Sequence, residues 1–94
     1  MKTANNITPT HFFHLGQVLA EEIEYRGMSR RELADAMGVA PTALSEIITG
    51  KRNITTSLAI KIEEALGINA LFFLNMQVRY EYYTLKERIG KRAA

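Results

Sequence analysis

Two groups of residues in this 94-residue sequence have types and spacings that could support chemistry. His11 and His14 would place both imidazoles on one face of a helix, where they could hold a metal ion. Glu21, Glu22 and Glu24 could supply paired carboxylates for acid–base catalysis. Neither set is complete, because no third ligand adjoins the histidines and no nucleophile or glycine-rich phosphate loop accompanies the glutamates. We therefore expect no metal, no cofactor and no enzymatic activity.

A different chemistry, hydrogen bonding to nucleic acid, suits the polar segment from residue 42 to residue 53. Threonine and serine hydroxyls bond to bases or phosphates, an alanine methyl can contact thymine, and a glutamate can accept from a cytosine amino group. We expect base contacts from Thr42, Ala43, Ser45 and Glu46. We expect contacts to the DNA backbone from Arg30, Thr49, Lys51, Arg52 and Asn53. Contacts of the second kind give affinity and salt dependence rather than sequence choice.

These residues could act together only if two helices cross steeply. One predicted helix opens at Ser29 and ends at Gly38, and the next begins at Pro41 and ends at Gly50. They are joined by "GVA", and such a short glycine-containing turn is typical of a helix-turn-helix. Ala34 allows close approach of the two backbones, and Gly38 tolerates a positive φ at the turn. Leu44 and Ile47 supply the inner face of the second helix. The pattern predicts a unit that reads the DNA major groove, with an ordinary corner of a helical bundle as the alternative.

The remaining sequence predicts three further helices and hence an all-α fold, because no alternating strand pattern occurs. Ser29 and Glu32 have the spacing of a capping box, and Pro41 suits a first helical position. Ala40, in contrast, offers no capping side chain. The expected buried faces before residue 67 contain Leu15, Val18, Leu19, Ile23, Leu33, Ala34, Met37, Leu44, Ile47, Ile48, Leu58, Ala59, Ile62 and Leu66.

The last predicted helix, from Ala70 into the eighties, has two apolar stripes. A surface helix of a small domain needs only one such stripe, so the second indicates a partner. We expect this helix to form a twofold dimer that sets two recognition helices about 34 Å apart on DNA. The alternative is a long helix wrapped by its own domain. The expected partner surface contains Leu71, Phe72, Met76, Val78, Tyr80, Tyr82, Tyr83 and Leu85.

Composition and charge are compatible with this interpretation. The length predicts one domain at residues 14–94, preceded by an arm at residues 1–13. The formal net charge is +2 and the sequence pI is about 9.1, so the chain is mildly basic. The sequence contains no cysteine, no apolar signal segment and no stretch long enough to span a membrane, which indicates a cytoplasmic location.

The segment "MSRRELADAMGVAPTALSEIITGKRNIT" resembles the Xre-type (lambda-repressor-like, Cro/C1) helix-turn-helix. The flanking segments "HLGQVLAEE" and "FFLNMQ" are similar to the HigA antitoxins, also called VapI or plasmid-maintenance antidote proteins, and the resemblance covers about residues 14 to 83. It implies a five-helix lambda-repressor-like domain and a dimer that binds an operator palindrome. It also implies neutralisation of a HigB-like mRNA-cleaving toxin and repression of the shared operon.

The sequence departs from that family at three positions. Arg30 stands where glutamine is usual, Ala40 where serine often caps the recognition helix, and Glu46 where a basic or polar residue is common. Two alternatives to the antitoxin therefore stay open. One is a stand-alone repressor without a toxin, and the other is a protein-interaction module that has lost DNA binding.

Overall fold

The computed structural model describes the backbone of residues 14–93 and the side chains of residues 14–90. This part of the chain consists of α1 (Leu15–Tyr25), α2 (Arg30–Met37), α3 (Pro41–Ile48), α4 (Thr56–Leu66) and α5 (Ala70–Ala93), without a strand. The all-α fold of five helices predicted from the sequence is therefore confirmed for the described residues. The predicted arm, with His11, lies outside the described residues.

Side chains at the helix starts define the boundaries of α1, α2 and α4. His14 Nδ1 accepts a hydrogen bond from the Gly16 amide at 2.9 Å and caps α1. Ser29 and Glu32 form the predicted capping box at α2, with bonds of 3.0 and 2.8 Å. Thr55 caps α4. Ala40 precedes α3 without any side-chain cap, as expected from its methyl group.

The core lies between the first four helices and the start of α5. α2 packs on α3 and α4, and α1 packs on α3, α2 and α5. The buried hydrophobic side chains are Leu15, Leu19, Ile23, Leu33, Ala34, Met37, Leu44, Ile47, Ile48, Ile54, Ala59, Ile62, Leu66, Ala70 and Phe73. Of the predicted core, only Val18 and Leu58 are less than fully buried, and both pack against this cluster.

Two core features were not predicted from the sequence. Phe73 is fully buried, whereas its neighbour Phe72 is 48% exposed. Gly16 lies so close to α3 that an added Cβ would stand 2.3 Å from the Ile48 carbonyl oxygen and 2.6 Å from that of Ile47. Helix α1 therefore rests directly on the backbone of α3, and this contact sets the position of α3.

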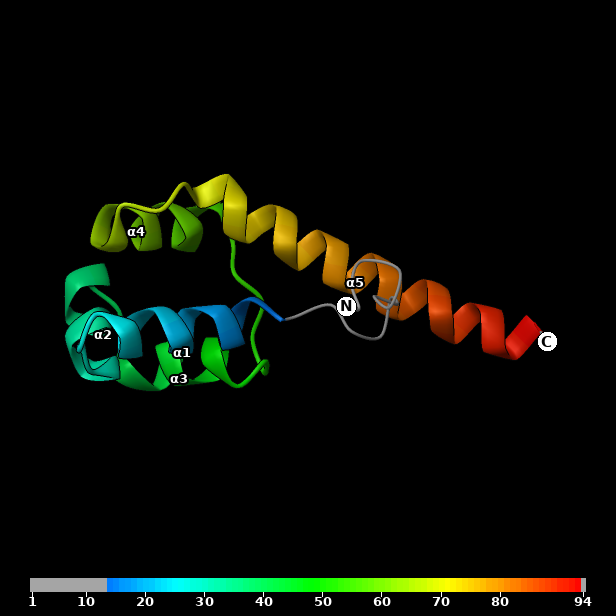
Figure 1. The fold of residues 1–94 in the computed structure, drawn as a ribbon, viewed down its shortest axis with the longest axis horizontal. Helices are drawn as coiled ribbons and strands as arrows, with labels where there is room; N and C mark the ends of the chain where they lie inside the picture. Colours follow the sequence, from blue (N-terminus) through cyan, green and yellow to red (C-terminus); the bar gives the residue numbers. More distant parts are fainter. Residues whose placement is uncertain (1–13, 94) are drawn as a thin grey trace, which may run out of the picture.

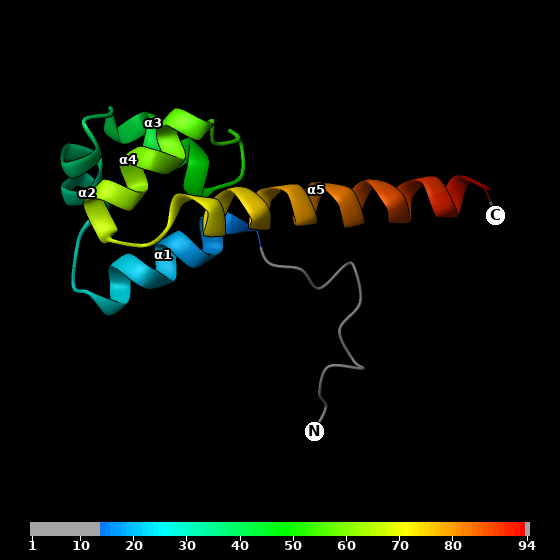
Figure 2. The same ribbon diagram turned by 90° about the horizontal axis from the view of Figure 1, so that it is seen from above.

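Helix α5 leaves the other helices after its first turns. It contains 24 residues, longer than predicted, and extends over about 36 Å at 1.5 Å per residue. Figures 1 and 2 show α1, α2, α3 and α4 gathered at one end and α5 projecting away from them. No helix within the described residues is both long enough and apolar enough to cross a membrane.

Candidate nucleic-acid interface

Helices α2 and α3 form the predicted steep corner. Ala34, Leu44 and Ile47 are all fully buried at this junction. Gly38 adopts φ +73°, the left-handed conformation that the turn requires, and the Val39 amide closes the turn on the Ala34 carbonyl at 3.0 Å. The inner face of α3 is thereby fixed, and its other flank is left toward solvent.

The four expected base-reading residues lie on or beside that outer flank. Thr42 is exposed, whereas Ala43, Ser45 and Glu46 are half-buried. Thr42, Glu46 and Thr49 follow one another at intervals of four and three residues, so they share one side of the helix. The Thr49 hydroxyl donates to the Ser45 carbonyl at 2.9 Å, a bond within its own turn.

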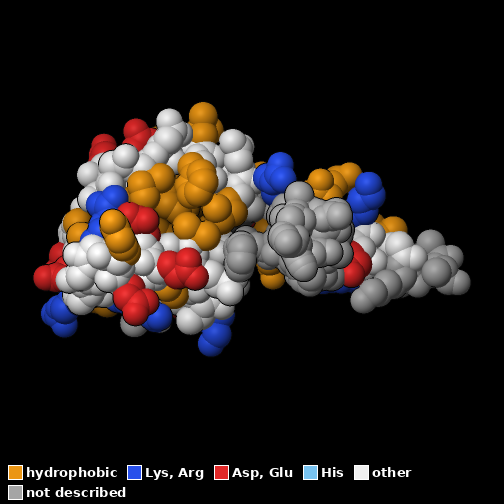
Figure 3. All heavy atoms as spheres, in the orientation of Figure 1, with side chains coloured by type: hydrophobic (Ala, Val, Ile, Leu, Met, Phe, Trp, Pro, Cys, Tyr) orange, Lys and Arg blue, Asp and Glu red, His pale blue; other side chains and the backbone are white. Residues whose placement is uncertain are grey.

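The expected phosphate-binding residues flank α3 from two sides. Arg30 is the first residue of α2 and is exposed there, where the positive end of the helix dipole also favours an anion. Lys51, Arg52 and Asn53 are exposed in the loop after α3. Figure 3 shows Lys and Arg side chains along the lower edge of the molecule, the edge at which Figure 1 places α3.

Glu46 and Arg52 pair with each other. Arg52 Nε and Nη2 both donate to Glu46 Oε1, at 2.9 and 2.7 Å, and both side chains remain about half exposed. The backbone supports this pairing, because the amides of Lys51 and Arg52 both donate to the Glu46 carbonyl, at 2.8 and 3.2 Å. Gly50, at φ +84°, lets the chain turn back over the end of α3. The negative charge on the recognition helix is therefore balanced locally.

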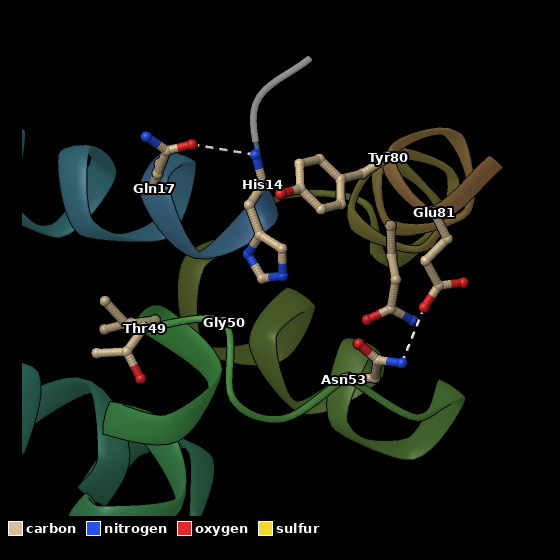
Figure 4. A pocket seen from close by; sticks show the side chains of 9 residues that line it. His14, Gln17, Thr49, Gly50, Asn53, Tyr80 and Glu81 are labelled. Carbon is tan, nitrogen blue, oxygen red and sulfur yellow. Dashed lines mark hydrogen bonds between the residues drawn. The ribbon is translucent and has the colours of Figure 1, made fainter. Parts of the chain in front are cut away.

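The loop after α3 is also tied to α5, a connection that was not predicted. Gln77 accepts from the Ile54 amide at 2.8 Å and donates to the Ile54 carbonyl at 3.0 Å. The Asn53 side chain donates to Glu81 Oε2 at 2.8 Å and so points toward α5 (Figure 4). Polar residues on a helix carry no signal of such pairings, because the partner segment is more than twenty residues away in sequence.

A polar pocket of about 390 Å³ lies beside this connection, between the start of α1, the end of α3 and α5. His14 projects toward Gly50 there, and its ring meets the edge of Tyr80 at a centroid distance of 5.1 Å (Figure 4). The lining residues are His14, Gln17, Ile48, Thr49, Gly50, Asn53, Gln77, Tyr80 and Glu81. Within the described residues, no three His, Asp or Glu side chains gather in a metal-binding arrangement.

The expected partner surface on α5 contains side chains that contact their own domain and side chains that are exposed. Tyr80 contacts His14, and Met76 packs against the core, so these two side chains serve their own domain. Tyr83 is half-buried and contacts Tyr82. Leu71, Phe72, Val78, Tyr82 and Leu85 are between 48% and 61% exposed. Figure 3 shows hydrophobic side chains where α4 meets the start of α5 and again further along α5.

Comparison with known proteins shows which family has this geometry. A family model described as helix-turn-helix matches residues 19–73. The uncharacterized HTH-type transcriptional regulator YddM of Escherichia coli is 35% identical over 77 residues, which are 82% of this chain and 76% of the relative. Antitoxin HigA-1 of Vibrio cholerae is 34% identical over 80 residues, which are 84% of this chain and 75% of the relative.

Solved structures agree with these relatives. The Pseudomonas aeruginosa antitoxin HigA, solved with the higBA promoter, matches with a TM-score of 0.80 at 26% identity, over 88% of this chain and 91% of that one. The family model spans more than half of the sequence, and the relatives are similar over most of their length. The chain therefore belongs to the Xre-type helix-turn-helix family, in the branch that contains the HigA antitoxins.

Proposed function

We propose that this protein is a dimeric DNA-binding antitoxin that represses its own operon and neutralises a HigB-like, mRNA-cleaving toxin. The observation that carries the DNA-binding part is the outer flank of α3, which the α2–α3 corner leaves toward solvent beside Arg30, Lys51 and Arg52. A related HigA protein with the same fold has been solved with its promoter.

The position of each residue on or beside α3 determines its proposed role in DNA binding. The outer flank of the N-terminal half of α3, beginning at the exposed Thr42, would enter the major groove. Arg30 and Lys51 flank it and would contact phosphates on either side. The pairing of Glu46 with Arg52 favours DNA binding over a lost function, because it reduces the repulsion between that carboxylate and the phosphates.

Dimerisation through α5 is supported by heptad spacing. Leu71, Asn75, Val78, Tyr82, Leu85 and Ile89 alternate at intervals of four and three residues, the spacing of a coiled-coil seam. The five apolar members are between 51% and 61% exposed in the single chain. Tyr82, Leu85, Lys86 and Ile89 also line a shallow apolar groove of about 230 Å³. The Tyr82 hydroxyl accepts a hydrogen bond from Lys86 Nζ and raises the pKa of that ammonium group.

A single substitution tests the dimer. Leu85→Glu places a charge in the proposed seam and should give a monomer by sedimentation equilibrium at micromolar concentration. Tyr25→Glu is the matched control, because Tyr25 is an apolar side chain that is 89% exposed on α1, away from α5. A wild-type protein that sediments as a monomer would refute this part of the proposal.

DNA binding is tested by fluorescence anisotropy with the duplex immediately upstream of the gene. The dissociation constant should rise steeply with salt, because phosphate contacts release counterions. Lys51→Met should weaken binding to all sequences and flatten the salt dependence, whereas Thr42→Ala should change the preferred sequence. Absence of salt-dependent binding to any duplex would favour the protein-interaction module.

Toxin neutralisation is tested through the neighbouring gene. Co-expression of the chain with a small basic protein encoded beside it should relieve growth arrest and yield a complex that copurifies. A chain that binds its upstream DNA but has no such neighbour is instead a stand-alone repressor.

A further inference from the structure

The pairing of Glu46 with Arg52 has a defined geometry. One edge of the guanidinium group, formed by Nε and Nη2, is occupied by a single carboxylate oxygen. The opposite edge presents one N–H from Nη1 and the second N–H of Nη2 as parallel donors. No acceptor within the described residues pairs with that edge, and the Arg52 side chain is 49% exposed.

We propose that Glu46 is a positioning residue that holds the Arg52 guanidinium group in the orientation needed to bind one guanine in each operator half-site. This inference rests on the proposed DNA-binding function and changes two roles within it. Glu46 acts through Arg52 instead of touching a base, and Arg52 reads a base instead of gripping phosphate. Guanine offers the O6 and N7 acceptors that match two parallel guanidinium donors in the major groove.

Charge favours guanine over phosphate as the partner. Phosphate attracts net positive charge, and the Glu46 carboxylate at 2.7 Å cancels much of the charge on Arg52. A guanine edge is neutral and needs correctly directed donors, which the pairing leaves available. Lys51, for which no such acidic partner is seen among the described residues, is better suited to the phosphate role.

Rigidity of the loop favours a base contact as well. The amides of Lys51 and Arg52 are fixed on the Glu46 carbonyl, and Ile54 is fixed by Gln77 at both its amide and its carbonyl. The loop is thus anchored at both ends, beside the same flank of α3 that carries Thr42. A guanidinium group held in one orientation discriminates between base edges, whereas a mobile one serves phosphates of any sequence.

The experiment first selects binding sites for the wild-type protein from a duplex library with a randomised core. We then measure binding after replacing each selected guanine in turn by 7-deazaguanine, which lacks the N7 acceptor. At one symmetric position the wild-type affinity should fall on the order of tenfold. Arg52→Met removes every donor at this position, so this variant should bind the natural and modified duplexes equally.

Glu46→Gln tests the positioning role. This variant keeps the size of the side chain but removes its charge, which weakens its hold on Arg52. Binding to random duplex should strengthen several-fold, and the preference for the selected guanine should weaken. A merely structural role of Glu46 would instead weaken binding to selected and random duplexes alike. Lys51→Met is the matched control, which should weaken both equally without changing the selected sequence.

Two outcomes would overturn the inference. One is that 7-deazaguanine at every selected guanine leaves the wild-type affinity unchanged, a test that depends on no variant folding correctly. The other is that Arg52→Met keeps the full guanine preference, which would assign that guanine to another residue. Failure of the proposed DNA-binding function is distinguishable from both, because no sequence would then be selected by the wild-type protein.

Discussion

Replacing Gly16 by alanine should destabilise the fold, although alanine is the better helix former. In an unobstructed helix the substitution would stabilise by about 0.5–1 kcal/mol. Here the new Cβ would stand 2.3 Å from the Ile48 carbonyl oxygen, 2.6 Å from that of Ile47 and 2.7 Å from the Ile48 carbonyl carbon. All three are backbone atoms, so no rotamer change can relieve the overlap, and α1 must move away from α3.

The net effect follows from these opposing contributions. Overpacking costs about 1–3 kcal/mol, and a clash with rigid backbone belongs at the upper end. After subtraction of the helix preference, we expect a loss of about 2 kcal/mol in the free energy of unfolding. For a domain of this size, that corresponds to a fall of about 10 °C in melting temperature. Because the contact with α1 positions α3, loss of this contact should also weaken DNA binding.

Urea unfolding followed by far-UV circular dichroism measures this change, at one fixed protein concentration because a dimer unfolds in a concentration-dependent way. Gly90→Ala is the matched control within the same chain. Gly90 lies in α5, and an added Cβ there meets nothing within 4 Å, so this variant should be slightly stabilised. A Gly16→Ala protein as stable as the wild type would refute the close contact between α1 and α3.

Substitutions at four further positions test other parts of the structure by the same unfolding measurement. Phe73→Ala should cost about 3–5 kcal/mol because it empties a fully buried site, whereas Phe72→Ala should cost about 1 kcal/mol. Equal effects would contradict the assigned orientation of α5. Gln77→Ala should cost about 2 kcal/mol, because it leaves the amide and carbonyl of Ile54 unpaired, and should speed hydrogen exchange at that amide. Gly38→Ala should cost about 1 kcal/mol through its positive φ, and Gly38→Asn less; a stabilised Gly38→Ala protein would refute the left-handed conformation at this turn.

Local signals in the sequence determined the helices and the corner between α2 and α3. Ser29 with Glu32, Gly38 and Pro41 each act within a few residues of their own position, so their effect can be read without knowing the fold. The buried faces before residue 67 were predictable for a related reason. A helix of known period presents every third or fourth residue to the same side.

Helix α5 was harder to interpret because it is apolar on more than one side. The sequence indicated a partner surface there, but periodicity alone did not separate Phe73, which is buried, from Phe72, which is half exposed. That choice depends on the angle at which α5 leaves α4, and this angle is set by contacts with α1 and α4. Two residues of the expected partner surface, Met76 and Tyr80, therefore also contact their own domain.

Composition, periodicity and caps thus determined that this chain is an all-α helix-turn-helix protein with a polar flank on its third helix. Tertiary structure alone decided how the polar groups beside that flank are paired. Arg52 returns to Glu46, and Asn53 turns to Glu81, because the chain reverses at Gly50 and α5 passes beside the loop. Such contacts join segments whose proximity is set by packing, and no local preference of either residue encodes them.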